Sequence, residues 1–124
     1  MKNDSNKKNL IVKQYDIWLG ELPEIKGDHV QHGQRPLLVV SNDTANTHSP
    51  VITVVPLTSQ TRKHHLPTHV LLCEQGLYKN SIALCEQIIT LDKSHLVHRI
   101  GYVYKKFDRI AVHHALAIQL GMTA

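Results

Sequence analysis

The sequence predicts a mainly β domain, a small barrel or highly curved sheet with one helix laid against it. Three observations support this prediction. Short apolar segments alternate with turn-rich stretches along most of the chain. The last apolar segment, in KKFDRIAVHHALAIQLG, changes to helical spacing. No internal repeat or second composition regime is visible, so we expect residues 11–124 to form one domain behind a polar, flexible tail of residues 1–10.

The expected strands differ in how they are buried. Gln14–Leu22 alternates Tyr15, Ile17 and Leu19 with polar or small neighbours, which is typical of a half-buried strand. The next strand starts at Arg35 and contains the unbroken apolar run Leu37–Val40, as expected when both faces are covered. Further strands are expected at residues 51–59, 68–74, 81–92 (bent) and 99–104.

The connecting segments are marked by turn residues and charge. Loops are expected at residues 23–34 and 60–67, a turn-rich stretch at 43–50, and one short helical turn within 93–98. Pro56 lies inside a strand and predicts an edge or a bulge. The final helix should end at Gly121, which stands where a C-terminal glycine belongs.

Composition narrows the classes of function. No apolar run approaches the roughly 20 residues that a membrane helix needs, and the polar N-terminus does not predict a secretory signal. Cys73 and Cys85 both lie in apolar runs and are expected to be reduced, buried thiols, so the expected location is the cytoplasm. Lys plus Arg exceed Asp plus Glu by 14 to 10, which suits a polyanionic partner such as RNA or DNA.

Arg35 stands at the mouth of the most apolar strand, in HGQRPLLVVSND. If residues 35–41 and 52–58 form an antiparallel hairpin centred on their connection, opposed residue numbers add to about 93. Arg35 then lies opposite Thr58, at the end where the two loops meet. A slip of one residue would separate them onto different faces. The alternative is that Arg35 forms a salt bridge with a carboxylate and Thr58 is an ordinary strand residue.

An arginine and a hydroxyl between two loops, one of them basic, form a plausible phosphate site. The basic loop could follow the backbone of a single nucleic-acid strand. The candidate RNA-binding residues of the two loops and the adjoining strand are Gln31, Gln60, Arg62, Lys63, His64, His65 and His69.

Several stretches together resemble the MazF/PemK toxins, the endoribonucleases of bacterial type II toxin–antitoxin systems. They are YDIWLGELP, GQRPLLVVSND, SPVITVVPLTSQ, LPTHVLL and SIALCEQIITLDKSHL, and the resemblance covers about residues 13–121. It implies an SH3-like barrel with a C-terminal helix that acts as a homodimer. It also implies sequence-specific cleavage of single-stranded RNA without a metal, and inhibition by a cognate acidic antitoxin. The resemblance makes Arg35 and Thr58 the catalytic pair.

The chain departs from the family in the first loop. Many members carry a glutamate before the glutamine, where this chain has Val30 before Gln31. A carboxylate general base from that loop is therefore in doubt, and His32 is a candidate because it titrates in a useful range. Glu86 and Gln87 are expected to brace the barrel or a loop.

Other functions remain open at this point. The ten histidines invite a zinc site, but Cys73 and Cys85 lack the spacing of one, so we expect no metal and no cofactor. A gyrase-poisoning toxin of the same fold, similar to CcdB, would bind a protein and need no catalytic pair. A non-catalytic RNA-binding barrel is a third possibility.

Overall fold

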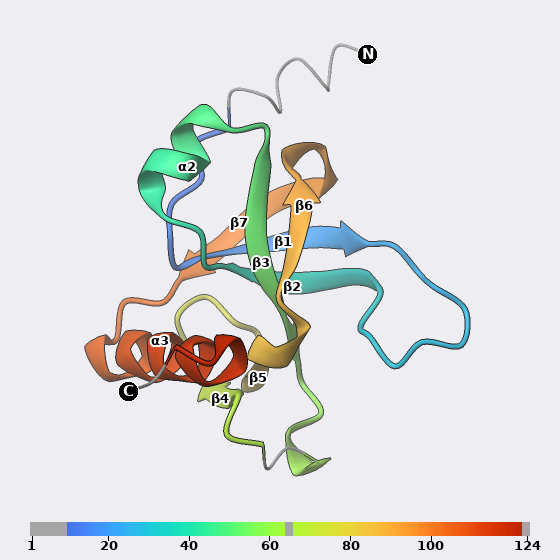
Figure 1. Cartoon of the computed structure of the whole chain (residues 1–124), viewed down its shortest axis with the longest axis vertical. Coiled ribbons are helices and arrows are strands. Elements are labelled where there is room, and N and C mark those ends of the chain that lie inside the picture. Colours follow the sequence, from blue (N-terminus) through green and yellow to red (C-terminus); the bar gives the residue numbers. More distant parts are fainter. Residues whose placement is uncertain (1–9, 64–65, 123–124) are drawn as a thin grey trace.

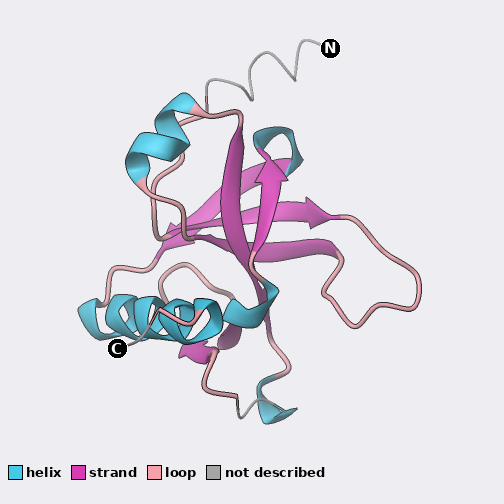
Figure 2. Cartoon of the chain, in the orientation of Figure 1, coloured by secondary structure: helices cyan, strands magenta, loops and turns pink. Residues whose placement is uncertain are grey.

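The computed structural model of the chain describes residues 10–63 and 66–122, so the tail expected at residues 1–10 lies, apart from Leu10, outside the described residues. The described part contains strands, α-helices and single 3-10 turns (Figures 1 and 2). The strands are β1 (Asp16–Leu22), β2 (Gly33–Val39), β3 (Val51–Thr58), β4 (His69–Leu72), β5 (Ser81–Leu84), β6 (Ile89–Asp92) and β7 (Leu96–Tyr102). The α-helices are α2 (Asp43–His48) and α3 (Lys106–Leu120), and the 3-10 turns are η1 (Thr61–Lys63), η2 (Cys85–Gln87) and η3 (Lys93–His95).

The strands form one antiparallel sheet with the order β4-β5-β3-β2-β1-β7, and β6 pairs with β3 as well. The expected mainly β fold with a C-terminal helix is confirmed. Among the described residues, however, β4 and β7 do not pair. The sheet is therefore open and curved, and its hydrogen bonds do not close it into a barrel.

Pro56 lies in the central strand β3 and not at an edge, and the β2–β3 register has no shift there that would mark a bulge, the other possibility that the sequence suggested. On one side of β3, pairing with β6 ends at Val54, and pairing with β5 begins at Leu57. Pro56 therefore falls where β3 exchanges one neighbour for the other, while its opposite side still faces Leu37 of β2. A missing backbone N–H is tolerated at such an exchange point because no ladder bond is lost there.

The alternation of side chains along the central strands fills two cores on opposite faces of the sheet. One core contains Leu38 and Val55 and receives Val112 from α3. The other contains Leu37 and Val54, together with Trp18, Leu91 and Leu96 among others. Because β2 contributes to both cores, its apolar run is unbroken, as expected from the sequence.

Helix α3 lies alongside β4 and η2 (Figure 1). It ends where the sequence predicted, because Gly121 adopts a left-handed conformation with φ of 67° and its N–H bonds to the last turn. Three segments differ from expectation. The helical turn expected at 93–98 forms only as η3, and β7 begins at Leu96, before the expected strand start at residue 99. The turn-rich stretch at 43–50 contains α2, which is capped by the Asn42 side chain, and the bent strand at 81–92 is divided into β5, η2 and β6.

No helix in the described part of the chain is long and apolar enough to cross a membrane.

Candidate functional site

The residues at the start of β2 orient the Arg35 side chain. Gly33 has φ of 78° at the start of β2, and the Arg35 Nε–H donates to the His32 carbonyl at 2.8 Å. Among residues 10–63 and 66–122, no carboxylate forms an ion pair with Arg35 and no other hydrogen bond engages its side chain. The terminal guanidinium nitrogens are thus uncommitted within the described structure, which does not fit a purely structural anchor.

Thr58 lies at the end of β3, where it is 4% exposed. Its hydroxyl accepts a hydrogen bond from the Gln60 N–H at 3.2 Å, and its backbone pairs with Ile82 of β5. The expected hairpin register is confirmed, because Leu37 pairs with Pro56 and Leu38 with Val55. Two further steps along that register place Arg35 across from Thr58, but the β2–β3 ladder ends before this point, and no hydrogen bond joins their side chains.

The loop between β1 and β2 extends from this end of the sheet (Figure 1). Residues 23–30 are exposed, and the loop is joined to η2 by the Gln31 N–H, which donates to Gln87 Oε1 at 2.8 Å. His32 follows at once; its Nε2 lies 3.8 Å from Glu24 Oε2, and both side chains are well exposed. Gln87 thus braces the β1–β2 loop, as the sequence predicted. The loop residue that it holds, Gln31, directly precedes His32, whose carbonyl accepts the hydrogen bond from Arg35.

Val30, which stands where the resemblance implies a glutamate, is 44% exposed and lies beside both apolar and polar side chains. It lines a cavity of about 250 Å³ between the loop and η2, where Ile25, Ile88 and Ile89 are also found. Gln31 lines the same cavity, and its Oε1 is buried without a hydrogen-bond partner among the described residues. Val30 itself brings no titratable group to this part of the site.

Glu86 contacts two side chains at the start of β4, those of Thr68 just before the strand and of His69 within it. Its carboxylate accepts a hydrogen bond from the Thr68 hydroxyl at 3.0 Å and contacts His69 Nε2 at 2.8 Å. Burial would raise the pKa of the Glu86 carboxyl, but the hydrogen bonds from His69, its own backbone and Thr68 together hold it below its ordinary value. Glu86 therefore braces β4 against η2, as expected.

The placement of His69 differs from its expected RNA-binding role. Its side chain is only 7% exposed and is engaged by Glu86. The β4 strand turns it toward η2, so it does not stand on the surface as a phosphate contact would. We therefore assign His69 to the support of the fold.

The other basic-loop residues are only partly described. Gln60 and Arg62 are exposed, and Arg62 lies in η1. Lys63 also belongs to η1, but its side chain, with His64 and His65, lies outside the described residues.

Two residues that the sequence reading left out, Tyr78 and Lys79, lie close to Arg35. All three line a cavity of about 200 Å³ at the start of β2. The pattern of their segment, QGLYKN, predicts only a turn. An aromatic residue beside a lysine at a turn was the available signal, but only the fold shows that this turn meets the start of β2.

The two cysteines are free, Cys85 being buried and Cys73 partly so. Burial, with a smaller contribution from the Glu86 charge, raises the pKa of the Cys85 thiol to about 12. A thiol of this kind is inert as a nucleophile near neutral pH.

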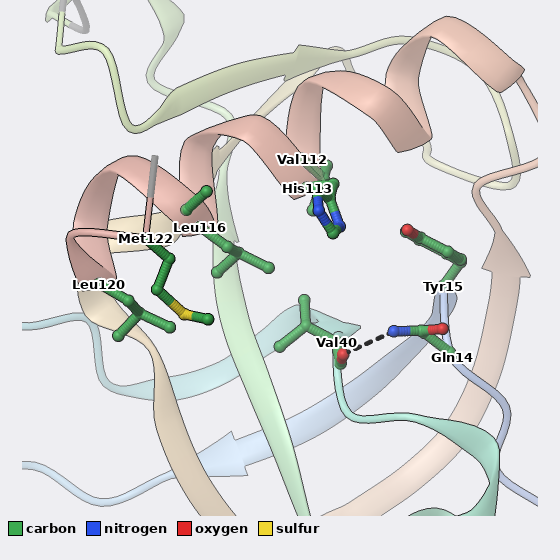
Figure 3. Close-up of a pocket in the computed structure, with 9 residues that line it drawn as sticks. Gln14, Tyr15, Val40, Val112, His113, Leu116, Leu120 and Met122 are labelled. Atoms are coloured by element: carbon green, nitrogen blue, oxygen red, sulfur yellow. Dashed lines mark hydrogen bonds between the residues drawn. The ribbon is translucent and has the colours of Figure 1, made fainter. Parts of the chain in front are cut away.

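A separate hollow of about 310 Å³ lies between α3 and the start of β1 (Figure 3). Its walls are mostly apolar, with Val40, Leu116 and Met122 among them, and the Gln14 side chain donates to the Val40 carbonyl at 3.0 Å. No lysine or arginine lines this hollow. It is therefore poorly suited to a phosphate, in contrast with the cavity at Arg35.

Comparisons with known proteins show the family of the chain. Residues 13–120 match the family model of the PemK-like, MazF-like toxin of type II toxin–antitoxin systems. A protein of Staphylococcus saprophyticus named Endoribonuclease MazF is 36% identical over 115 residues, which are 90% of this chain and 93% of that protein.

Solved structures agree at the level of the fold. A mycobacterial endoribonuclease in complex with its cognate antitoxin has a TM-score of 0.75 and 25% identity, over 91% of this chain and 98% of that one. MazF from Deinococcus radiodurans has a TM-score of 0.72 and 24% identity, over 89% of this chain and 96% of that one. From the match over most of its length, the chain belongs to the PemK-like, MazF-like toxins of type II toxin–antitoxin systems.

Proposed function

We propose that this chain is the toxin of a type II toxin–antitoxin system and acts as a sequence-specific, metal-independent endoribonuclease on single-stranded RNA. Family membership and the Staphylococcus relative named as an endoribonuclease support the reaction class. The observation that carries the proposal is Arg35, whose Nε is held by a backbone carbonyl while no described carboxylate neutralises its charge.

The reaction follows from the chemistry of RNA. The 2′-hydroxyl attacks the adjacent phosphorus, the bond to the 5′-oxygen breaks, and the proton lost by the 2′-hydroxyl is balanced by one delivered to the leaving oxygen. The products are a 2′,3′-cyclic phosphate and a 5′-hydroxyl. Arg35 would stabilise the charge that builds on the phosphorane oxygens, and one such donor is worth about 10²–10³ in rate. Thr58 would orient the phosphate or the 2′-hydroxyl.

His32 is our candidate for the general base. Its imidazole is 49% exposed and belongs to the loop that leads into β2. An imidazole can act as a general base, whereas the Val30 side chain at the matching loop position has no proton to exchange. No step of the scheme requires a metal or an organic cofactor.

We expect three partners for this chain: RNA, an antitoxin and a second copy of the chain. Gln31, Gln60, Arg62 and Lys63, with His64 and His65 outside the described residues, would contact the RNA backbone. The solved mycobacterial relative is in complex with its cognate antitoxin, which supports an antitoxin partner for this chain, and the basic residues around Arg62 would suit an acidic one. We expect a homodimer that acts in the cytoplasm.

Cleavage of a mixed-sequence single-stranded RNA by the purified protein, with end-group analysis, tests this proposal. We expect fragments with 2′,3′-cyclic phosphate and 5′-hydroxyl ends, at the same rate with and without EDTA, and no cleavage of the DNA of the same sequence. Intact RNA together with inhibition of gyrase would favour the CcdB-like alternative. Binding of RNA without cleavage would favour the non-catalytic barrel.

A further inference from the structure

The loop between β4 and β5 presents an aromatic side chain to solvent from a firmly held backbone. Tyr78 is 97% exposed. The loop below it is fixed by Gln75, which is 4% exposed and whose side chain bonds to the Cys73 carbonyl, Asp108 and the N–H groups of Tyr104 and Lys105. An exposed ring on a firmly held loop is accessible to a ligand, and its contact area is not already used by the fold.

Leu77 and Gly76 also hold this loop in place. Leu77 packs against the core under α3. Gly76 approaches the backbone so closely that an added Cβ would lie 2.6 Å from the Ile100 carbonyl oxygen. The position of the Tyr78 backbone is thus set before any ligand arrives, which lowers the entropic cost of binding through its ring.

The cavity beside Tyr78 has the chemistry of a nucleotide site. Its polar lining consists of two cations, two hydroxyls, a phenol and an amide, from Arg35, Lys79, Ser59, Ser81, Tyr78 and Gln34. No acidic residue lines it. Such a set attracts a phosphodiester and offers the attached base a π-face, and it adjoins the arginine that we place at the scissile phosphate.

We propose that Tyr78 and Lys79 form a nucleotide subsite next to Arg35. Tyr78 stacks on the base of a nucleotide beside the scissile phosphate, and Lys79 pairs with a neighbouring phosphate. Since every base has a π-face, this subsite adds affinity for single strands without dictating sequence. The assignment rests on the proposed function, because RNA is the strand that Arg35 would hold there.

Affinity for an uncleavable strand tests the stacking. The probe is a fluorescein-labelled, fully 2′-O-methylated RNA of mixed sequence, which lacks the attacking hydroxyl, and binding is followed by anisotropy. Replacement of an aromatic side chain that stacks on one base weakens affinity by about 5- to 150-fold. Tyr78→Ala should weaken binding by this amount, and Tyr78→Phe should bind as the wild type does. The matched control is Tyr104→Ala, since Tyr104 is 52% exposed and does not line the cavity.

A tryptophan in place of Tyr78 would report the stacking contact with RNA directly, through its fluorescence. In Tyr78→Trp, the methylated RNA should quench the emission of the new indole, while the wild-type signal from Trp18, which is 6% exposed, should stay constant. For Lys79, Lys79→Gln should reduce the slope of log affinity against log salt by about 0.7, the value for one phosphate contact on a single strand. A salt slope equal to that of the wild type would remove Lys79 from the subsite.

Wild-type binding by Tyr78→Ala, or unquenched emission from Tyr78→Trp at saturating RNA, would overturn the stacking. So would a change in the sedimentation mass of Tyr78→Ala, which would place the ring between copies of the chain. Failure of the endoribonuclease proposal looks different. In that case the wild type leaves unmodified RNA intact, while its binding of the methylated strand still depends on Tyr78.

Discussion

Glu86 shows how single buried contacts order the site. It holds Thr68 and His69 of one segment while its neighbour Gln87 holds the β1–β2 loop. Hydrogen bonds to a carboxylate are stronger than those between neutral groups. Three consecutive residues, 85–87, thereby connect the core, strand β4 and the loop that precedes Arg35.

The pH dependence of folding should contain a contribution from Glu86. Its pKa in the folded chain lies below its ordinary value of 4.5, so the stabilisation is complete above that value and is lost as the pH falls through the folded pKa. Glu86→Gln should lower the free energy of unfolding at pH 7 by about 1–3 kcal/mol and flatten its decline under acid. Urea unfolding from pH 7 down to about 3 measures both effects, since that range spans the ordinary pKa of a glutamate.

The matched control is Glu74→Gln. The hydrogen bond from Lys105 also lowers the pKa of Glu74, but this pair lies at the surface, where solvent screens it. We expect this variant to follow the wild-type curve. Identical acid profiles for Glu86→Gln and the wild type would show that the Glu86 contacts do not stabilise the fold.

At the scale of elements, the β1–β2 loop and η2 act together. The loop is exposed from residue 23 to 30, and the Gln31 N–H reaches across to Gln87. His32 then supplies the carbonyl that binds the Arg35 Nε–H. Loss of the Gln87 acceptor should therefore loosen the segment that orients the guanidinium.

Gln87→Leu should accelerate hydrogen exchange at the Gln31 amide and reduce RNA cleavage by about 2- to 10-fold, the worth of one neutral hydrogen bond. Gln87→Glu retains an acceptor oxygen and should preserve both the protection of Gln31 and most of the activity. Amide exchange measured by NMR decides the structural part. Equal protection of Gln31 in all three proteins would mean that Gln87 does not restrain the loop.

Sequence patterns predicted secondary-structure elements correctly where a local sequence rule alone determines them. The first strand and the Gly121 C-cap were confirmed. The expected half-buried alternation of the first strand was wrong, because Ile17 packs into one core and Trp18 into the other, so both faces of β1 are covered. Pro56 was misassigned because its tolerance depends on the exchange of β6 for β5 along β3, which is a tertiary event. The split of residues 81–92 was missed for a similar reason, since η2 is held by contacts with Thr68, His69 and Gln31.

At the scale of the whole molecule, several large apolar side chains are exposed to solvent. Phe107 is 85% exposed and Ile110 54% exposed on α3, and Met122 just beyond the helix is 74% exposed. Monomers rarely expose large apolar patches, so we expect the chain to dimerise. Sedimentation equilibrium should give twice the chain mass of 14.0 kDa at micromolar concentration. A single species at the chain mass would contradict this.

An acidic antitoxin segment should compete with RNA for the basic surface around Arg62, because carboxylates can occupy positions where phosphates otherwise lie. Binding of the antitoxin should weaken as salt rises and should block RNA cleavage. Titration of the toxin with its antitoxin at two salt concentrations measures both effects. Binding that is insensitive to salt, or that leaves cleavage unchanged, would rule out a shared surface.

The sequence predicted the strand register at the candidate site, whereas the positions of His69 and Tyr78 became apparent only from the fold. Residue counting alone gave the register that brings Arg35 toward Thr58, and the ladder from Leu37 to Val39 has that register. Burial of His69 beside Glu86 was not predictable, because an exposed and a buried strand histidine look alike in sequence. Tyr78 was missed because its position next to Arg35 depends on how a distant loop folds back.

Single-turnover cleavage of an RNA with one accepted site, by Arg35→Ala, tests the central claim most directly. We expect a folded dimer with a wild-type melting temperature and a cleavage rate lower by about 10² or more. Thr58→Ala should impair the same step, so the double variant should lose less than the product of the two single losses. Cleavage near the wild-type rate by a folded Arg35→Ala protein would contradict the assignment of Arg35 as the residue that stabilises the transition state.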